Sequence, residues 1–161
     1  MKKIFFFIIL FLITITYVKA NTVTLVKNSI DNTYTYYYDR TLQRDRFLYA
    51  NRYTFGDTTA YCLEMGKLID SNIYTYSTSF EEANIDKGAL DFINIVLYYG
   101  YDYPGHNTDK YYMATQEIIW NRLTNTGMSW IIDMDPENKI NIREEKDNIM
   151  ELFNTHYIKP S

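Results

Sequence analysis

The single cysteine of this chain, Cys62, and one of its two glutamines, Gln116, carry side chains that can react with each other. A thiol and a side-chain amide can condense with loss of ammonia, which leaves an internal thioester. This bond is an acyl electrophile, so a nucleophile of another molecule that attacks it becomes attached to the glutamine side chain. The chain therefore contains both halves of a bond that would capture a nucleophile covalently.

The residues around Cys62 predict a strand over Thr58–Leu63, because they are rich in β-branched and aromatic types. Period-2 alternation places Cys62 on one face of this strand with Ala60 and Glu64. A strand holds a side chain rigidly, which a reaction between two distant residues requires.

The residues around Gln116 predict a helix that Thr108 caps. Gln116 falls on the apolar stripe of this helix, where a carboxamide needs hydrogen-bond partners or is consumed in a covalent bond. The stripe consists of Tyr112, Gln116, Ile119, Trp120 and Leu123.

The wider pattern predicts an α+β fold, with an antiparallel β-rich N-terminal part followed by a small helical part. Residues 22–64 read as strands, except that the charged segment Arg40–Arg52 is expected to be a loop or an exposed hairpin. From Asn84 the apolar period changes to that of a helix, which Gly100 ends. A short strand is predicted at Ser129–Asp133 and a last helix at Ile142–Phe153.

The first twenty residues predict a secretory signal peptide, which leaves residues 21–161 as one domain. Lys2 and Lys3 precede an apolar run over Ile4–Ile15, and Val18-Lys19-Ala20 fits the small-x-Ala cleavage rule loosely. An uncleaved anchor is the alternative. Because no second apolar stretch or sorting motif is apparent near the C-terminus, we expect a released protein or the N-terminal part of a longer one.

The charge of the chain argues against two classes of partner, and its cysteine content limits what the thiol can do. The formal net charge of −4 becomes more negative once Lys2, Lys3 and Lys19 are removed, which argues against nucleic acid and against an anionic membrane surface. A secreted chain with one cysteine cannot form an internal disulfide. Its thiol is then buried and inert, paired with another molecule, or consumed in another bond.

Two motifs resemble those of the thioester (TQXA-type) domains of Gram-positive surface adhesins. Tyr61-Cys62-Leu63 is similar to the aromatic-Cys-apolar motif, and Thr115-Gln116, followed by Ile119-Trp120, is similar to the Thr-Gln-x-Ala motif. The resemblance extends over Thr59–Trp120. Ile118 stands where the family usually has alanine, and the short separation of the motifs leaves room only for a small insertion.

The resemblance implies a surface or secreted adhesin domain whose Cys62–Gln116 thioester captures a lysine amine on a host or extracellular-matrix protein. Such a domain acts once and is not an enzyme, and it needs no cofactor or metal. Its pocket residues would be Tyr61, Leu63, Tyr112, Thr115 and Trp120. Glu64 and Glu117 are interpreted as exposed, solubilising carboxylates, with tuning of proton transfer as the alternative.

Two other functions stay open at this point. Cys62 could be the nucleophile of a cysteine hydrolase with His106 or His156 as its base, although each histidine is expected at the surface and no glycine-rich elbow is apparent. The chain could also be a non-covalent, tyrosine-rich binding module with an inert buried cysteine. The intact mass of the mature protein separates this module from a thioester, and turnover separates a hydrolase from both.

Overall fold

A four-stranded antiparallel sheet forms the base of the fold in the computed structural model, which describes residues 22–67, 69, 73–75, 84–124 and 126–156. The predicted signal peptide, residues 1–20, lies outside the described residues. The strand order is β4-β3-β2-β6, in which every neighbouring pair is antiparallel. The bounds are β2 Val26–Asp39, β3 Arg44–Phe55, β4 Thr58–Ala60 and β6 Met128–Ile132.

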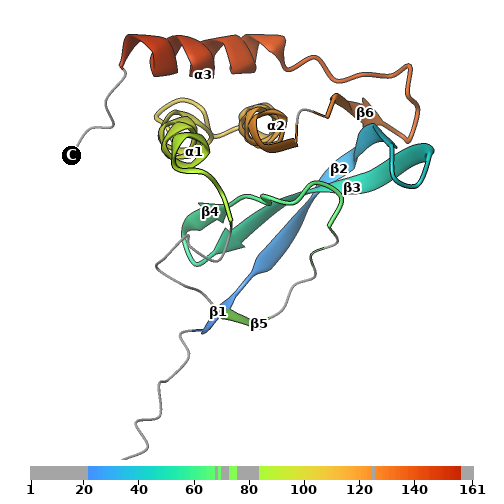
Figure 1. Cartoon of the computed structure of the whole chain (residues 1–161), viewed down its shortest axis with the longest axis horizontal. Helices are drawn as coiled ribbons and strands as arrows, with labels where there is room; N and C mark the ends of the chain where they lie inside the picture. The colour runs from blue at the N-terminus through green and yellow to red at the C-terminus, as the bar shows by residue number, and fades with distance from the viewer. Residues whose placement is uncertain (1–21, 68, 70–72, 76–83, 125, 157–161) are drawn as a thin grey trace, which may run out of the picture.

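Three helices complete the fold: α1 Lys87–Tyr99, α2 Asp109–Thr124 and α3 Arg143–Thr155. Figure 1 shows α1 and α2 between the sheet and α3, and a separate two-stranded sheet of β1 (Thr22–Thr24) and β5 (Ile73–Thr75). The prediction of an α+β fold is confirmed. None of the described helices combines the length and apolar character that a bilayer-spanning helix needs.

The charged segment Arg40–Arg52 forms the turn and most of the second strand of the β2–β3 hairpin. The Asp39 carboxylate closes the turn by accepting hydrogen bonds from the backbone N–H groups of Thr41 and Leu42, both at 3.0 Å. Of the two forms that were predicted for this segment, the structure therefore has the hairpin.

The middle helix α2 is buried along most of its length, because the sheet, α1 and α3 surround it. Every side chain from Tyr112 to Trp120 is buried. At the end of α1, Gly100 lies so close to α2 that a β-carbon on it would come within 2.5 Å of the Thr115 hydroxyl oxygen. Glycine is thus required where the two helices approach at the residue before Gln116.

The predicted strand Thr58–Leu63 ends at Ala60, so the prediction that Cys62 lies on a strand is wrong. The reason is the Tyr112 hydroxyl, which donates to the Ala60 carbonyl (3.1 Å) and accepts from the Tyr53 N–H (3.4 Å). Ala60 and Tyr53 are register partners, so this hydroxyl bridges the last rung of the β3–β4 ladder. The chain then turns, and the Tyr61 ring stacks on Tyr112 with centroids 4.9 Å apart.

Replacement of Tyr112 by phenylalanine is expected to lower the free energy of unfolding by about 2 kcal/mol, because the buried bridge loses its polar atom. Urea denaturation measures the change. Tyr98→Phe is the matched control, since Tyr98 is exposed and should lose little. Equal effects of the two changes would show that the bridge does not support the segment that carries Cys62.

Candidate functional site

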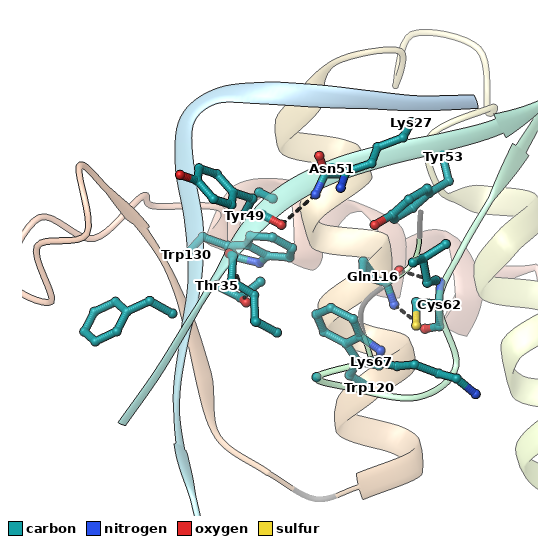
Figure 2. A pocket seen from close by; sticks show the side chains of 15 residues that line it. Lys27, Thr35, Tyr49, Asn51, Tyr53, Cys62, Lys67, Gln116, Trp120 and Trp130 are labelled. Atoms are coloured by element: carbon teal, nitrogen blue, oxygen red, sulfur yellow. Dashed lines mark hydrogen bonds between the residues drawn. The ribbon is translucent and has the colours of Figure 1, made fainter. Parts of the chain in front are cut away.

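Gln116 and Cys62 are joined by a pair of hydrogen bonds that runs from the side chain of one to the backbone of the other. The Cys62 N–H donates to Gln116 Oε1 at 2.9 Å, and Gln116 Nε2 donates to the Cys62 carbonyl at 2.8 Å. Gln116 is only 2% exposed. Figure 2 shows the two residues facing each other, Gln116 from α2 and Cys62 from the turn after β4. The carboxamide is thereby fixed next to the residue that carries the thiol.

The Cys62 thiol is half-buried and donates to the backbone carbonyl of Glu64 at 3.0 Å. Burial raises the pKa of this thiol, because a thiolate is less well solvated there than in water. At neutral pH the group is therefore protonated. A thiolate of high pKa is also a poor leaving group, so an acyl group placed on this sulfur would be released slowly in the absence of a strong nucleophile.

Alkylation of Cys62 in a Gln116→Ala variant, whose thiol has no acyl partner, is expected to have a pH midpoint above the value of about 8.5 of an ordinary cysteine. The raised pKa of the buried thiol means that less thiolate is present at any given pH. Initial rates with iodoacetamide between pH 6 and pH 10, roughly the range around that pKa, give the midpoint. The same variant unfolded in urea is the control, and equal midpoints in both states would contradict the prediction.

Cys62 and Gln116 lie in the wall of a cavity of about 280 Å³ between α2 and the sheet. Trp120 of α2 and Trp130 of β6 form an aromatic wall, with ring centroids 6.2 Å apart and planes 18° from parallel. Lys67 also lines the cavity, and its ammonium pairs with the Glu64 carboxylate at 2.9 Å. That hydrogen bond raises the pKa of the Lys67 ammonium, so at neutral pH this amine is not a nucleophile.

The predicted pocket residues do not all face this cavity. Trp120 lines it together with Cys62 and Gln116. Tyr61 and Leu63 line a second, mostly apolar cavity, which lies between β4 and α1. The backbone at Cys62 therefore separates the two cavities. Tyr112 and Thr115 of α2 are fully buried and line neither cavity.

Most of the other residues that line the reactive cavity could not be predicted from the sequence, among them Asn51, Lys67 and Trp130. No motif includes them. Trp130 falls within a predicted strand, but its strand neighbour and its facing helix could not be known from the sequence.

The two carboxylates near the site differ in their environments. Glu64 is exposed, as predicted. The interpretation of Glu117 as an exposed, solubilising residue is wrong: the residue is 7% exposed, and its carboxylate pairs with the Lys146 ammonium of α3 at 2.7 Å. Glu117 points away from the reactive cavity because it follows Gln116 directly on α2, and it attaches α3 to the helix that carries Gln116.

Neither histidine lies in the wall of the reactive cavity. His106 is buried, which corrects the expectation of a surface residue; its ring stacks on Tyr111 at 3.8 Å and its Nδ1 lies 2.9 Å from the Tyr99 carbonyl. His156 is exposed at the end of α3. A cysteine hydrolase would need a base within reach of Cys62, and the described residues that line the cavity include no histidine. Across the described residues, no three His, Cys, Asp or Glu side chains gather as metal ligands would.

Comparison with known families gives one match, in which the family model described as "Thioester domain" covers residues 59–157. The match includes both predicted motifs and continues through α2, β6 and α3. No curated protein and no solved structure matches the chain.

Proposed function

This chain belongs to the thioester-domain family, and on that premise we propose that Cys62 and Gln116 condense into an internal thioester that captures an amine of another molecule. The observation that carries the proposal is the pair of hydrogen bonds between the Gln116 carboxamide and the Cys62 backbone. These bonds hold the Gln116 amide against the backbone of the residue that carries the thiol. For well-aligned groups of one molecule, effective concentrations of about 10⁵ M or more are known.

Formation of the bond begins with attack of the Cys62 sulfur on Cδ of Gln116. The Cδ–Nε2 bond then breaks, and the thiol proton leaves with Nε2 as part of ammonia. The Cys62 N–H donates to Oε1, the oxygen on which negative charge develops, so it stabilises the tetrahedral intermediate. The Cys62 carbonyl accepts from Nε2 and keeps the amide oriented until ammonia departs.

Capture is the reverse exchange with a different amine. The nitrogen of the incoming amine attacks Cδ, the Cδ–Sγ bond breaks, and the Cys62 sulfur takes up the proton that the amine loses. The product is an amide on Gln116 and a free thiol, so the captured molecule stays attached to the chain and no product is released. Each molecule therefore acts once, which is covalent capture without turnover.

The partner that we propose is a lysine on a host or extracellular-matrix protein, captured by a secreted or surface-attached form of residues 21–161. Two features support this part of the proposal. The resemblance of the motifs is to domains of Gram-positive adhesins, and the mouth of the reactive cavity includes the exposed Tyr49. Tyrosine offers contact area at a low cost in conformational entropy, so a non-covalent encounter can precede the reaction.

The experiment is incubation of the purified domain with serum or matrix proteins, followed by boiling in detergent. A band at the summed mass of domain and partner is expected, and mass spectrometry should locate an isopeptide bond between Gln116 and a lysine. Gln116→Ala should give no such band. Reaction with small amines but with no protein of any host fraction would contradict the adhesin role.

A non-covalent binding module is the second candidate, and one observation favours it. The two hydrogen bonds to the Cys62 backbone already satisfy the Gln116 carboxamide, so burial alone does not require a covalent bond. The family match favours the thioester. The intact mass distinguishes the two, since a module with an inert thiol has the full mass of its sequence.

A further inference from the structure

A tight turn brings the backbone of Lys67 close to the Cys62 thiol. The thiol donates to the Glu64 carbonyl at 3.0 Å, and the Lys67 N–H donates to the same oxygen at 3.4 Å. The sulfur and the Lys67 backbone nitrogen are therefore no farther apart than the sum of these two distances. Gly66, with a φ of 83°, takes the position of this turn that glycine adopts most readily.

The side chain of Lys67 lies in the same cavity wall as the two reacting residues, Cys62 and Gln116. Burial raises the pKa of the Cys62 thiol, and the charge of the nearby Lys67 ammonium opposes part of that shift. The ammonium stands at the end of a flexible four-carbon stem. Rotation about the bonds of this stem brings Nζ within reach of an acyl group that Gln116 and Cys62 share.

The other lysine in the described part of the cavity wall is less well placed. Lys27 belongs to β2, whereas Cys62 follows β4, and β3 lies between these two strands. Lys67 is attached to the same turn as the thiol. Of the two amines, Lys67 is thus the one that the backbone holds beside the reacting sulfur.

An amine of the same chain competes strongly with an amine of a partner. A nucleophile on a short flexible tether has an effective concentration on the order of millimolar or higher, whereas the lysine of a partner must first arrive by diffusion. A thioester beside an unrestrained lysine would therefore react with its own chain first.

We propose that Lys67 is a second nucleophile for the thioester, which gives an isopeptide bond between Lys67 and Gln116, and that the Glu64 carboxylate delays this self-capture. The proposal rests on the proposed function and adds to it the fate of a bond that meets no partner. The deprotonated Lys67 Nζ attacks Cδ of Gln116, the Cδ–Sγ bond breaks, and the Cys62 sulfur takes up the proton that the nitrogen loses. No atom leaves the chain.

The restraint on Lys67 is its ion pair with Glu64, in which nitrogen and oxygen lie 2.9 Å apart. Figure 2 shows the Lys67 nitrogen pointing away from Gln116. The pair keeps the amine protonated and directed toward solvent. Both side chains are more than half exposed, so water screens the pair and its hold is partial. Glu64 therefore slows self-capture without preventing it.

The test uses a mass signature that separates self-capture from hydrolysis. Self-capture leaves the intact mass of the thioester form unchanged but frees a thiol, whereas hydrolysis frees the thiol and adds one water. Fresh protein whose mass shows the thioester is incubated without amine at mildly alkaline pH, and intact mass and alkylatable thiol are followed together. The wild type should gain a free thiol without a gain in mass, and peptide mapping should find Lys67 linked to Gln116.

Two lysine variants identify the nucleophile. Lys67→Arg keeps the positive charge beside Glu64 but carries a guanidinium that does not deprotonate, so its thiol should appear only together with the added water. Lys27→Arg is the matched control from the same cavity wall and should behave as the wild type. Methylamine should still open the bond in both variants.

Two carboxylate variants test the restraint. Glu64→Gln should accelerate self-capture by about threefold relative to opening by methylamine, which is the scale of an exposed ion pair. Asp91→Asn is the control, because it removes an exposed pair with Lys87 on α1, away from the cavity, and should change nothing. An unchanged ratio in Glu64→Gln would overturn the role of Glu64.

Release of the thiol only together with an added water, equally in the wild type and in Lys67→Arg, would overturn self-capture. That result differs from failure of the proposed function, in which the fresh protein has its full mass and methylamine gives no adduct.

Discussion

Replacement of Cys62 by alanine is expected to abolish covalent capture completely while the domain stays folded. The two hydrogen bonds that hold Gln116 go to the backbone of Cys62, so alanine keeps both and removes only the reacting sulfur. Without a thiol, the Gln116 amide is as unreactive as any other glutamine, and neither methylamine nor a protein lysine should be incorporated. Intact mass before and after methylamine treatment measures the effect, and circular dichroism checks the fold.

A matched control for the reacting amide is Gln43, the other glutamine of the chain. Gln43 lies in the β2–β3 turn with a φ of 50°, a conformation that asparagine tolerates. Gln43→Asn should therefore capture methylamine as the wild type does, whereas Gln116→Asn, with a side chain one methylene shorter, should not. Incorporation of methylamine by the Cys62→Ala protein would show that the cysteine is not the acyl carrier.

Opening of the thioester by methylamine is expected to lower the free energy of unfolding by about 4 kcal/mol, on the loop-entropy account of cross-links. A bond from Cys62 to Gln116 closes a loop that contains β5, α1 and half of α2. The cross-link restricts the unfolded chain, and this restriction disappears when the bond opens. Urea denaturation before and after treatment measures the change, and a thiol-reactive dye should detect one new thiol per chain.

The control for this experiment is Cys62→Ala, which has no bond to open and whose stability methylamine should not change. A wild-type protein whose stability is equally insensitive to methylamine would contradict a cross-link between the two segments.

The α+β class was predictable because the apolar pattern changes its period near Asn84, and the structure follows it with strands before that point and with α1 and α2 after it. Asp86 caps α1 by accepting a hydrogen bond from the Ala89 N–H at 2.9 Å. The family resemblance, which the match over residues 59–157 confirms, was predictable from two short motifs.

The errors have a common cause, which is that a side chain from a distant segment decides the local structure. The strand at Thr58–Leu63 stops early because Tyr112 of α2 takes the hydrogen bonds of its last rung. Glu117 is buried because Lys146 of α3 pairs with it. No local pattern reports these partners.

The most direct test of the thioester is the intact mass of the freshly purified mature domain under non-reducing conditions. The condensation of Cys62 with Gln116 removes one ammonia, so the mass should lie about 17 Da below that of the sequence, as expected for an acylated thiolate. Cys62 should then resist alkylation until an amine opens the bond. A full mass together with a Cys62 that alkylates at once in fresh protein would contradict the account.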